Sequence, residues 1–137
     1  MTPVLSEEIV LEVPFHDVDM MGVAWHGHYL KYLEIARTAM MRKVGLDYAQ
    51  LKDTGYMWPV VECHLKYIRP LRYGMRVRVK ATLVECENRV KISYLLTDDA
   101  TGERLNKALT VQLAVKADTG ELAFELPPSV LAAIPRS

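Results

Sequence analysis

The sequence lacks an excess of charge and any long apolar run, and these absences exclude several classes of protein. Its 137 residues carry 17 basic and 17 acidic side chains, so it lacks the broad positive face that tracks nucleic-acid phosphates. No stretch reaches the length of a membrane span. The opening MTPVLSEEIVLEV has neither the basic start nor the apolar core of a secretory signal. We therefore expect a cytoplasmic protein that neither binds nucleic acid nor spans a membrane.

Cysteine is scarce, and several well-known chemical motifs are missing. Cys63 and Cys86 are too few for a cysteine-based metal cluster. Both lie in strand-like patterns, so we expect two buried, reduced thiols, because free cysteine behaves as a small hydrophobic residue. Neither the G-x-S-x-G of serine hydrolases nor a glycine-rich phosphate loop occurs. The sequence predicts no cofactor and no metal.

The chain has the length and apolar content of one domain, which we place at residues 1–137. Residues 29–44 follow a helical period with a wide apolar face, and Gly45 suits the end of that helix. Short helices are expected within residues 46–55 and 128–134. Strands are expected at 9–13, 58–68, 77–83, 90–96 and 109–115, joined by turns too short for parallel crossovers. The pattern predicts an α+β fold in which an antiparallel sheet curls around the long helix.

Ionisable side chains gather just ahead of the long helix, in the segment FHDVDMMGVAWHGHYLKYLEIAR. Asp17 and Asp19 alternate on what reads as an extended segment, so we expect their side chains to point the same way. Two carboxylates this close can raise the pKa of one of them, although loop aspartates are also ordinary turn formers. His26 and His28 follow, and their spacing with the aspartates is not a zinc pattern. The more common role for such histidines is a buried, hydrogen-bonded one.

The start of the long helix is itself a candidate site. Its first N–H groups have no partner within the helix, and the helix dipole is positive there. Such an end can hold a carbonyl oxygen that becomes negative during acyl transfer. A carboxylate in the preceding loop could then act as general base or as nucleophile, and the sequence alone does not choose between them.

Residues 15–30, FHDVDMMGVAWHGHYL, together with the following Y-L-E-x-A-R, resemble the 4-hydroxybenzoyl-CoA thioesterase branch of the hotdog-fold superfamily. They are similar in style to the Tol-Pal-associated acyl-CoA thioesterases. A weaker match continues through residues 67–74, YIRPLRYG. The resemblance implies a hotdog fold, with a long central helix wrapped by a five- to six-stranded antiparallel sheet. It also implies homodimers or homotetramers with active sites at subunit interfaces, and hydrolysis of an acyl-CoA or acyl-carrier-protein thioester.

The resemblance also implies residue roles. It places the catalytic carboxylate at Asp19 and the carbonyl-polarising backbone N–H groups near Trp25 and His26. The His26 side chain would orient water or substrate, while Asp17 and Gly22 would shape the loop. Gly22 suits this role because glycine adopts a positive φ without strain.

Four further residues are candidates for substrate binding. Trp58 would line an acyl pocket, or simply belong to the core. Glu62 interrupts an apolar strand, so it is a buried partner of the site or a residue on an exposed edge. Arg89 and Lys91 lie at a turn where some family members dock CoA phosphates. The neighbouring Glu87 weakens such a site, which leaves room for a carrier-protein substrate.

Two other functions remain open at this point. The hotdog fold also hosts dehydration of 3-hydroxyacyl thioesters, and a fold alone does not decide function. A non-catalytic acyl-thioester binding protein is the alternative from a different class. The D-x-D-x-x-G loop ahead of the helix favours the thioesterase.

Overall fold

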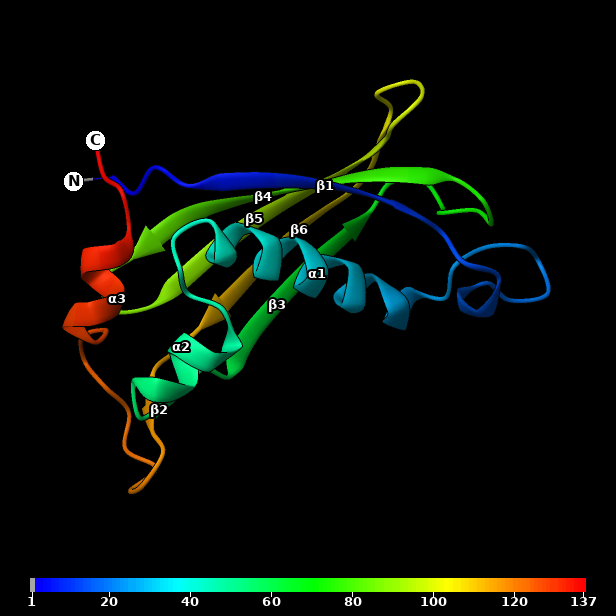
Figure 1. Ribbon diagram of the computed structural model, residues 1–137. Helices are drawn as coiled ribbons and strands as arrows, with labels where there is room; N and C mark the ends of the chain where they lie inside the picture. The colour runs from blue at the N-terminus through cyan, green and yellow to red at the C-terminus, as the bar shows by residue number, and fades with distance from the viewer. Residues whose placement is uncertain (1) are drawn as a thin grey trace.

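The computed structural model describes residues 2–137 and shows a curved antiparallel sheet wrapped around one long helix (Figure 1). The sheet has five strands in the order β1-β4-β5-β6-β3. Their bounds are β1 Ser6–Glu12, β3 Val60–Tyr67, β4 Arg76–Cys86, β5 Val90–Asp98 and β6 Arg104–Gln112. A separate pair joins β2 (Tyr56–Met57) to β7 (Val115–Lys116). The predicted α+β hotdog architecture is confirmed.

The central helix α1 spans Tyr29–Arg42, two residues shorter than predicted. Two short 3-10 turns precede it, η1 at Phe15–Asp17 and η2 at His26–His28. Gly45 follows α1 with a φ of 74°, the left-handed conformation that commonly ends a helix. Helices α2 (Tyr48–Asp53) and α3 (Pro128–Ala133) fall where the sequence placed them. None of the helices in residues 2–137 is long and apolar enough to cross a membrane.

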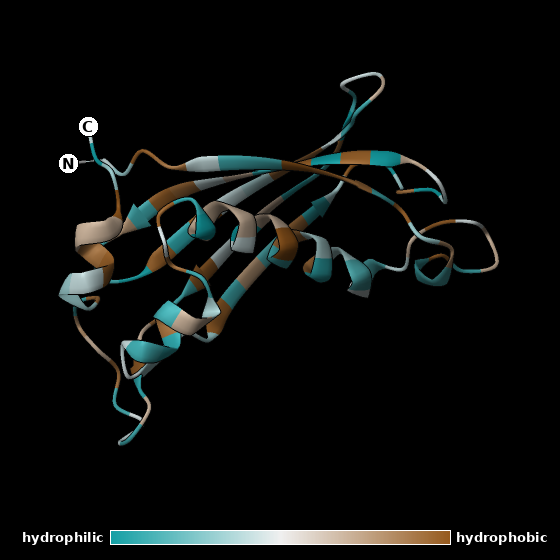
Figure 2. Cartoon of the chain, viewed as in Figure 1, coloured by the Kyte–Doolittle hydropathy of each residue, from teal (hydrophilic) through white to brown (hydrophobic). Residues whose placement is uncertain are grey.

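The core lies between α1 and the concave face of the sheet. Alternate residues of β4 and β5 are buried there, which gives the banding of hydropathy along these strands in Figure 2. Helix α1 contributes Tyr29, Tyr32, Leu33, Ala36 and Met40 to the same core. Helix α1 packs mainly against β1 and β4, at one side of the sheet.

Strand β6 begins five residues before the start predicted from alternation. The sequence pattern pointed to residues 109–115, whereas the strand spans Arg104–Gln112. The reason is a β-bulge: Leu96 pairs with Asn106 and Thr97 with Arg104, so Leu105 is an extra residue. Leu105 and Asn106 are both buried, and this breaks the period of two that strand prediction relies on.

Strand β3 is an open edge, and this overturns one expectation about the cysteines. Seven of its eight residues are exposed, because no element within residues 2–137 pairs with its outer side. Cys86 is buried as predicted, but Cys63 lies on β3 and is exposed. Glu62 is exposed as well, which settles the choice in favour of the sheet edge.

Candidate active site

The two aspartates of the loop point in different directions, contrary to the expectation from alternation. The segment is not extended at Asp17, because Phe15–Asp17 forms the 3-10 turn η1. The turn directs the Asp17 side chain inward, where it is buried, while Asp19 remains exposed. The pair therefore does not form a dyad of carboxylates sharing a proton.

Asp17 fixes the loop to helix α1. Its carboxylate accepts hydrogen bonds from Lys31 Nζ at 2.7 Å and from the Tyr32 hydroxyl at 2.6 Å. The Nδ1 atom of His28 lies 3.6 Å away. Burial raises the pKa of the Asp17 carboxyl, but the hydrogen bonds from Lys31 and Tyr32 outweigh it and hold that pKa below its ordinary value. Asp17 is thus an ionised, satisfied group with no free oxygen lone pair aimed at solvent.

Asp19 stands in a tight turn at the surface. One carboxylate oxygen, Oδ1, accepts from the backbone N–H of Met21 at 2.8 Å and of Val23 at 3.3 Å. The turn closes through Gly22 N–H to the Asp19 carbonyl at 3.0 Å, and Gly22 has a φ of 75°, as the sequence predicted. The second carboxylate oxygen has no hydrogen-bond partner within residues 2–137. It is the oxygen available to a substrate or a water molecule.

The loop is tied directly to the start of the helix. The Trp25 N–H donates to the Asp17 carbonyl at 3.2 Å, so this group is not free to polarise a substrate. Of the two backbone N–H groups expected to polarise the carbonyl, those of Trp25 and His26, only that of His26 is available. It lies at the start of η2 and has no acceptor in the part of the chain that the structure describes. A Cβ on Gly27 would collide with the exposed Trp25 indole, so a larger residue there would force the indole to move.

An aromatic cluster covers this end of α1. The Tyr67 ring centroid lies 4.6 Å from that of His26 and 4.9 Å from that of Tyr29. The Tyr67 hydroxyl donates to the His26 carbonyl oxygen across 3.5 Å, which is a long and weak hydrogen bond. Sequence reasoning did not place Tyr67 at the site, although its position at the end of an edge strand, three residues before Pro70, was a usable signal.

A cavity of about 760 Å³ lies near the other end of α1, between α1, α2 and the short strand β2. Trp58 lines it, together with Arg37, Gln112 and apolar side chains from both helices. The indole Nε1 of Trp58 is buried and has no acceptor. Within one chain, therefore, Trp58 and Asp19 lie at opposite ends of the central helix.

The remaining predicted residues are also distant from Asp19 in a single chain. Arg89 and Lys91 follow the far end of β4, an eleven-residue strand whose first residue lies near the Asp19 loop. At about 3.3 Å per residue the strand spans on the order of 35 Å. Arg89 Nε contacts Glu85 at 3.1 Å, and the carboxylate of Glu62 lies 3.7 Å from His64 Nε2. No group of three His, Cys, Asp or Glu side chains within residues 2–137 is placed to hold a metal ion.

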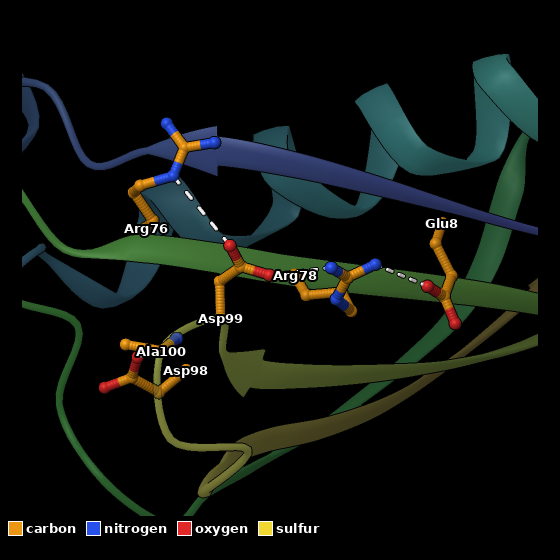
Figure 3. A network of polar contacts seen from close by, with 6 residues as sticks. All are labelled: Glu8, Arg76, Arg78, Asp98, Asp99 and Ala100. Atoms are coloured by element: carbon orange, nitrogen blue, oxygen red, sulfur yellow. Dashed lines mark hydrogen bonds and ion pairs between the residues drawn. The ribbon is translucent and has the colours of Figure 1, made fainter.

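The cationic face of β4 is largely neutralised. Arg78 pairs with Glu8 and with Asp99, each at 2.7 Å, and Arg76 lies 3.9 Å from Asp99 (Figure 3). Because these arginines already have carboxylate partners, they are poorly placed to bind substrate phosphates.

Comparison with known proteins agrees with this architecture. Residues 13–134 match the model of the thioesterase-like superfamily. A Synechocystis protein named as an esterase is 34% identical over 124 residues, covering 90% of this chain and 75% of that one. A Bacillus subtilis protein named as an acyl-CoA thioesterase is 34% identical over 84 residues, 61% of this chain and 60% of that one. The structure of DHNA-CoA thioesterase from Staphylococcus aureus superimposes with a TM-score of 0.85 at 26% identity, covering 93% of this chain and 87% of that one.

These matches do not single out one branch of the superfamily. Membership of the 4-hydroxybenzoyl-CoA and Tol-Pal-associated branch therefore stays a prediction. Together with the fold, the Asp19 loop and the start of α1, the matches do support assignment to the superfamily as a whole. The chain belongs to the thioesterase-like superfamily, and it is a thioester hydrolase with the hotdog fold.

Proposed function

We propose that the protein hydrolyses acyl thioesters, with Asp19 as the catalytic carboxylate and the start of the central helix polarising the carbonyl. One observation supports this proposal: the loop before α1 is fixed to that helix by the hydrogen bonds of Asp17. It presents a carboxylate oxygen of Asp19 without a partner and, seven residues later, the free N–H of His26. A helix N-terminus that holds the carbonyl oxygen, with a carboxylate in the same loop, is an arrangement that supports acyl transfer to water.

Two chemical routes fit this arrangement. As a general base, Asp19 takes a proton from water while the water oxygen adds to the thioester carbon; the C–S bond then breaks, and the departing thiolate takes up the proton. As a nucleophile, its oxygen adds to that carbon, the thiolate leaves, and water then hydrolyses the resulting anhydride. In both routes the carbonyl oxygen carries the developing negative charge, which the His26 N–H and the helix dipole stabilise. Both routes yield the free acid and the thiol.

We further propose that the working unit is a homodimer formed through β3. The strand is exposed on both faces and leaves a row of backbone donors and acceptors unpaired at its outer side. Exposed apolar side chains accompany it, including Val60, Val61 and Ile68. Antiparallel pairing of β3 with a second copy satisfies these backbone groups and buries the apolar side chains. Whether two dimers then form a tetramer is a separate question.

Such pairing joins the two halves of the site. Tyr67, at one end of β3, contacts His26. Val60, at the other end, follows Trp58 by two residues and pairs with Gln112, which lines the cavity. In an antiparallel pair the Tyr67 end of one copy lies beside the Val60 end of the other. The Asp19 loop of one copy thereby meets the cavity of its partner, which would receive the acyl group.

The same pairing favours CoA as one source of the thiol. Val90 lines the cavity and stands between Arg89 and Lys91. The partner's Lys91, which makes no ion pair within residues 2–137, then lies at the mouth of the shared site within reach of a nucleotide phosphate, whereas Arg89 would first have to leave Glu85. An acyl carrier protein, whose prosthetic arm lacks the nucleotide, remains the second candidate substrate.

The test is release of thiol from a panel of acyl-CoA and acyl-carrier-protein esters by the wild type, Asp19→Asn and Asp53→Asn. Asp53 is an exposed carboxylate at the end of α2 and serves as the matched control. We expect the control to keep full activity and Asp19→Asn to lose about a hundredfold or more in kcat. Asparagine keeps the oxygen that accepts from Met21 and Val23, so the turn survives. Full activity in Asp19→Asn would refute the assignment of Asp19.

Two outcomes of the same panel would support other functions. Hydration of a crotonyl thioester without thiol release would indicate a dehydratase. Tight binding of acyl thioesters with no turnover of any of them would indicate a binding protein.

A further inference from the structure

Two donor side chains line the cavity between α1, α2 and β2 and lack the partners that their surroundings call for. The Trp58 indole lines the cavity, and its Nε1–H is buried with no acceptor within residues 2–137. A buried donor without an acceptor costs free energy, and native structures rarely keep one without a reason. The second donor is the guanidinium of Arg37, which lines the same cavity and belongs to a half-buried side chain.

Arg37 differs from the other cations of α1 because no carboxylate within residues 2–137 pairs with it. The other two basic residues of the helix are each paired with an aspartate at 2.7 Å. Glu34 lies three residues before Arg37, where the two side chains could pair along the helix, yet they make no ion pair. Burial raises the pKa of the Tyr94 hydroxyl, and the nearby Arg37 guanidinium offsets part of that rise. The charge of Arg37 therefore acts at the buried face of the sheet, where it has no anion.

The two donors are connected to the same short stretch of β6. The Trp58 carbonyl accepts from Gln112 Nε2 at 2.9 Å, which fixes this residue to the end of the strand. Arg37 lies near Tyr94, whose hydroxyl is hydrogen-bonded to that of Thr110 at 2.8 Å. Thr110 and Gln112 are two residues apart on one strand, which is about 7 Å along the same face. One small group can therefore lie within reach of both donors.

The remaining walls of the cavity suit an apolar chain that ends in an anion. The side chains of Met41, Leu51 and Val130 contribute to an apolar lining. Of the two carboxylates in the lining, Asp47 is already paired with an arginine, and Glu34 is exposed. The volume of about 760 Å³ is within the range of small-molecule sites. The occupant that fits is apolar along its length and carries acceptor oxygens where the two donors lie.

We propose that Arg37 and the Trp58 N–H bind a carboxylate at the end of the acyl chain remote from the thioester, so that the enzyme favours carboxyl-terminated acyl thioesters. A guanidinium holds a carboxylate through two parallel hydrogen bonds, and an indole N–H is a donor only. Both groups therefore match an acceptor with two oxygens. The proposal rests on the proposed function, because it places the acyl group in this cavity. It adds a substrate class and the two side chains that recognise it.

The experiment compares pairs of CoA esters that differ only in the end of the acyl chain. Suberyl-CoA is measured against octanoyl-CoA, and adipoyl-CoA against hexanoyl-CoA. We expect the wild type to favour at least one carboxylated ester in kcat/KM by about tenfold or more. Arg37→Met should reverse that preference, because the carboxylate then loses its water without gaining a partner. Trp58→Phe keeps an aromatic ring and removes the N–H, so it should lower the preference by about threefold or more.

Two further variants separate a specific contact from a general effect of charge. Lys80→Met removes one positive charge from an exposed position on β4, outside the cavity, and should keep the wild-type preference. Arg37→Lys keeps the charge but not the two parallel donors, and should keep only part of the preference. No preference in the wild type, or one that survives in Arg37→Met, would overturn the proposal. An equal loss on both esters of a pair in Arg37→Met would also overturn it, because the role of Arg37 would then concern the CoA part or the fold.

A binding measurement separates failure of this proposal from failure of the proposed function. The thioethers S-(7-carboxyheptyl)-CoA and S-octyl-CoA cannot be hydrolysed, and they share the CoA part, so its phosphates contribute equally to both. Isothermal titration calorimetry should find that the wild type binds the carboxylated thioether about tenfold more tightly, and that Arg37→Met loses this difference. The difference in a protein that hydrolyses no ester would refute the proposed hydrolysis and support the carboxylate site. Equal Kd values for the wild type would overturn the carboxylate site whether or not the esters are hydrolysed.

Discussion

At the scale of single residues, Asp17 is expected to stabilise the fold through its bonds to α1. Its carboxylate is buried and ionised, and replacing it by asparagine leaves Lys31 and Tyr32 without the negative charge they share. Lys31 is itself 46% exposed, so water compensates part of the loss. We expect Asp17→Asn to lower the free energy of unfolding by about 1–3 kcal/mol at neutral pH. Urea unfolding followed by circular dichroism measures it.

The pH dependence of the same contribution has a definite sign. The pKa of Asp17 is lower in the folded protein than in the unfolded chain, where an aspartate titrates near pH 4. Its stabilisation is therefore fully present above that pH and is lost as the pH falls through the lower pKa of the folded state. The difference in unfolding free energy between wild type and Asp17→Asn should shrink in acid. A difference that stays constant down to about pH 2 would contradict this account.

The sequence could predict that Asp17, Asp19 and His26 lie in one loop ahead of the helix, but not which way the two aspartates face. The alternation of Asp17 and Asp19 indicated a common direction, and the 3-10 turn η1 reverses it. That turn depends on the tertiary bonds of Asp17 to α1, which lie 14 and 15 residues away in the sequence. Local pattern carries no information on such a bond. Gly22 was predictable, because its positive φ is a local requirement of the turn.

At the scale of elements, the start of α1 depends on close packing of Trp25 over Gly27. A methyl group at Gly27 would collide with the indole, so either the indole or η2, which carries the His26 N–H, must move. We expect Gly27→Ala to reduce kcat/KM by about tenfold to a hundredfold, because small displacements of a catalytic group are costly. Steady-state kinetics and tryptophan fluorescence measure the two effects. In a Trp25→Ala background the loss caused by Gly27→Ala should be much smaller, and an equal loss would exclude this steric cause.

The strands show why some elements were predictable and others not. Strands β4 and β5 are paired on both sides, and their inner residues are buried in alternation except at the bulge between Leu83 and Glu85, so the sequence period located most of both strands. Strand β6 was misplaced because its bulge puts Leu105 and Asn106 on one face. Cys63 was misjudged because apolar residues on β3 looked like core, whereas they lie on an edge that this chain alone does not cover.

For the whole molecule, the open edge predicts that association depends on β3. A lysine at Val61, which is 49% exposed on β3, should disfavour strand pairing by charge and yield monomers. Val84→Lys is the matched control, because Val84 is 43% exposed on β4, which is paired on both sides. Sedimentation velocity should find a dimer or larger species for wild type and the control. A Val61→Lys variant that still associates would place the interface elsewhere.

A shared site also predicts complementation between two inactive chains. If the Asp19 loop works with the partner's cavity, a mixed dimer of Asp19→Asn and Trp58→Ala chains contains one site with both defects and one with neither. Co-expressed and isolated mixed dimers should therefore recover up to about half of wild-type activity, since uniform dimers of either kind have no intact site. Mixed dimers as inactive as the two parents would show that loop and cavity act within one chain.

The division of labour between the two aspartates is the central claim, and one paired measurement tests it most directly. Thiol release and thermal unfolding are measured together for Asp17→Asn and Asp19→Asn. We predict that Asp19→Asn keeps the wild-type Tm and loses about a hundredfold or more in kcat. Asp17→Asn should lose Tm and stay within about tenfold of wild-type kcat where it is folded. The reverse pattern, with activity lost in a stable Asp17→Asn and retained in Asp19→Asn, would contradict the account.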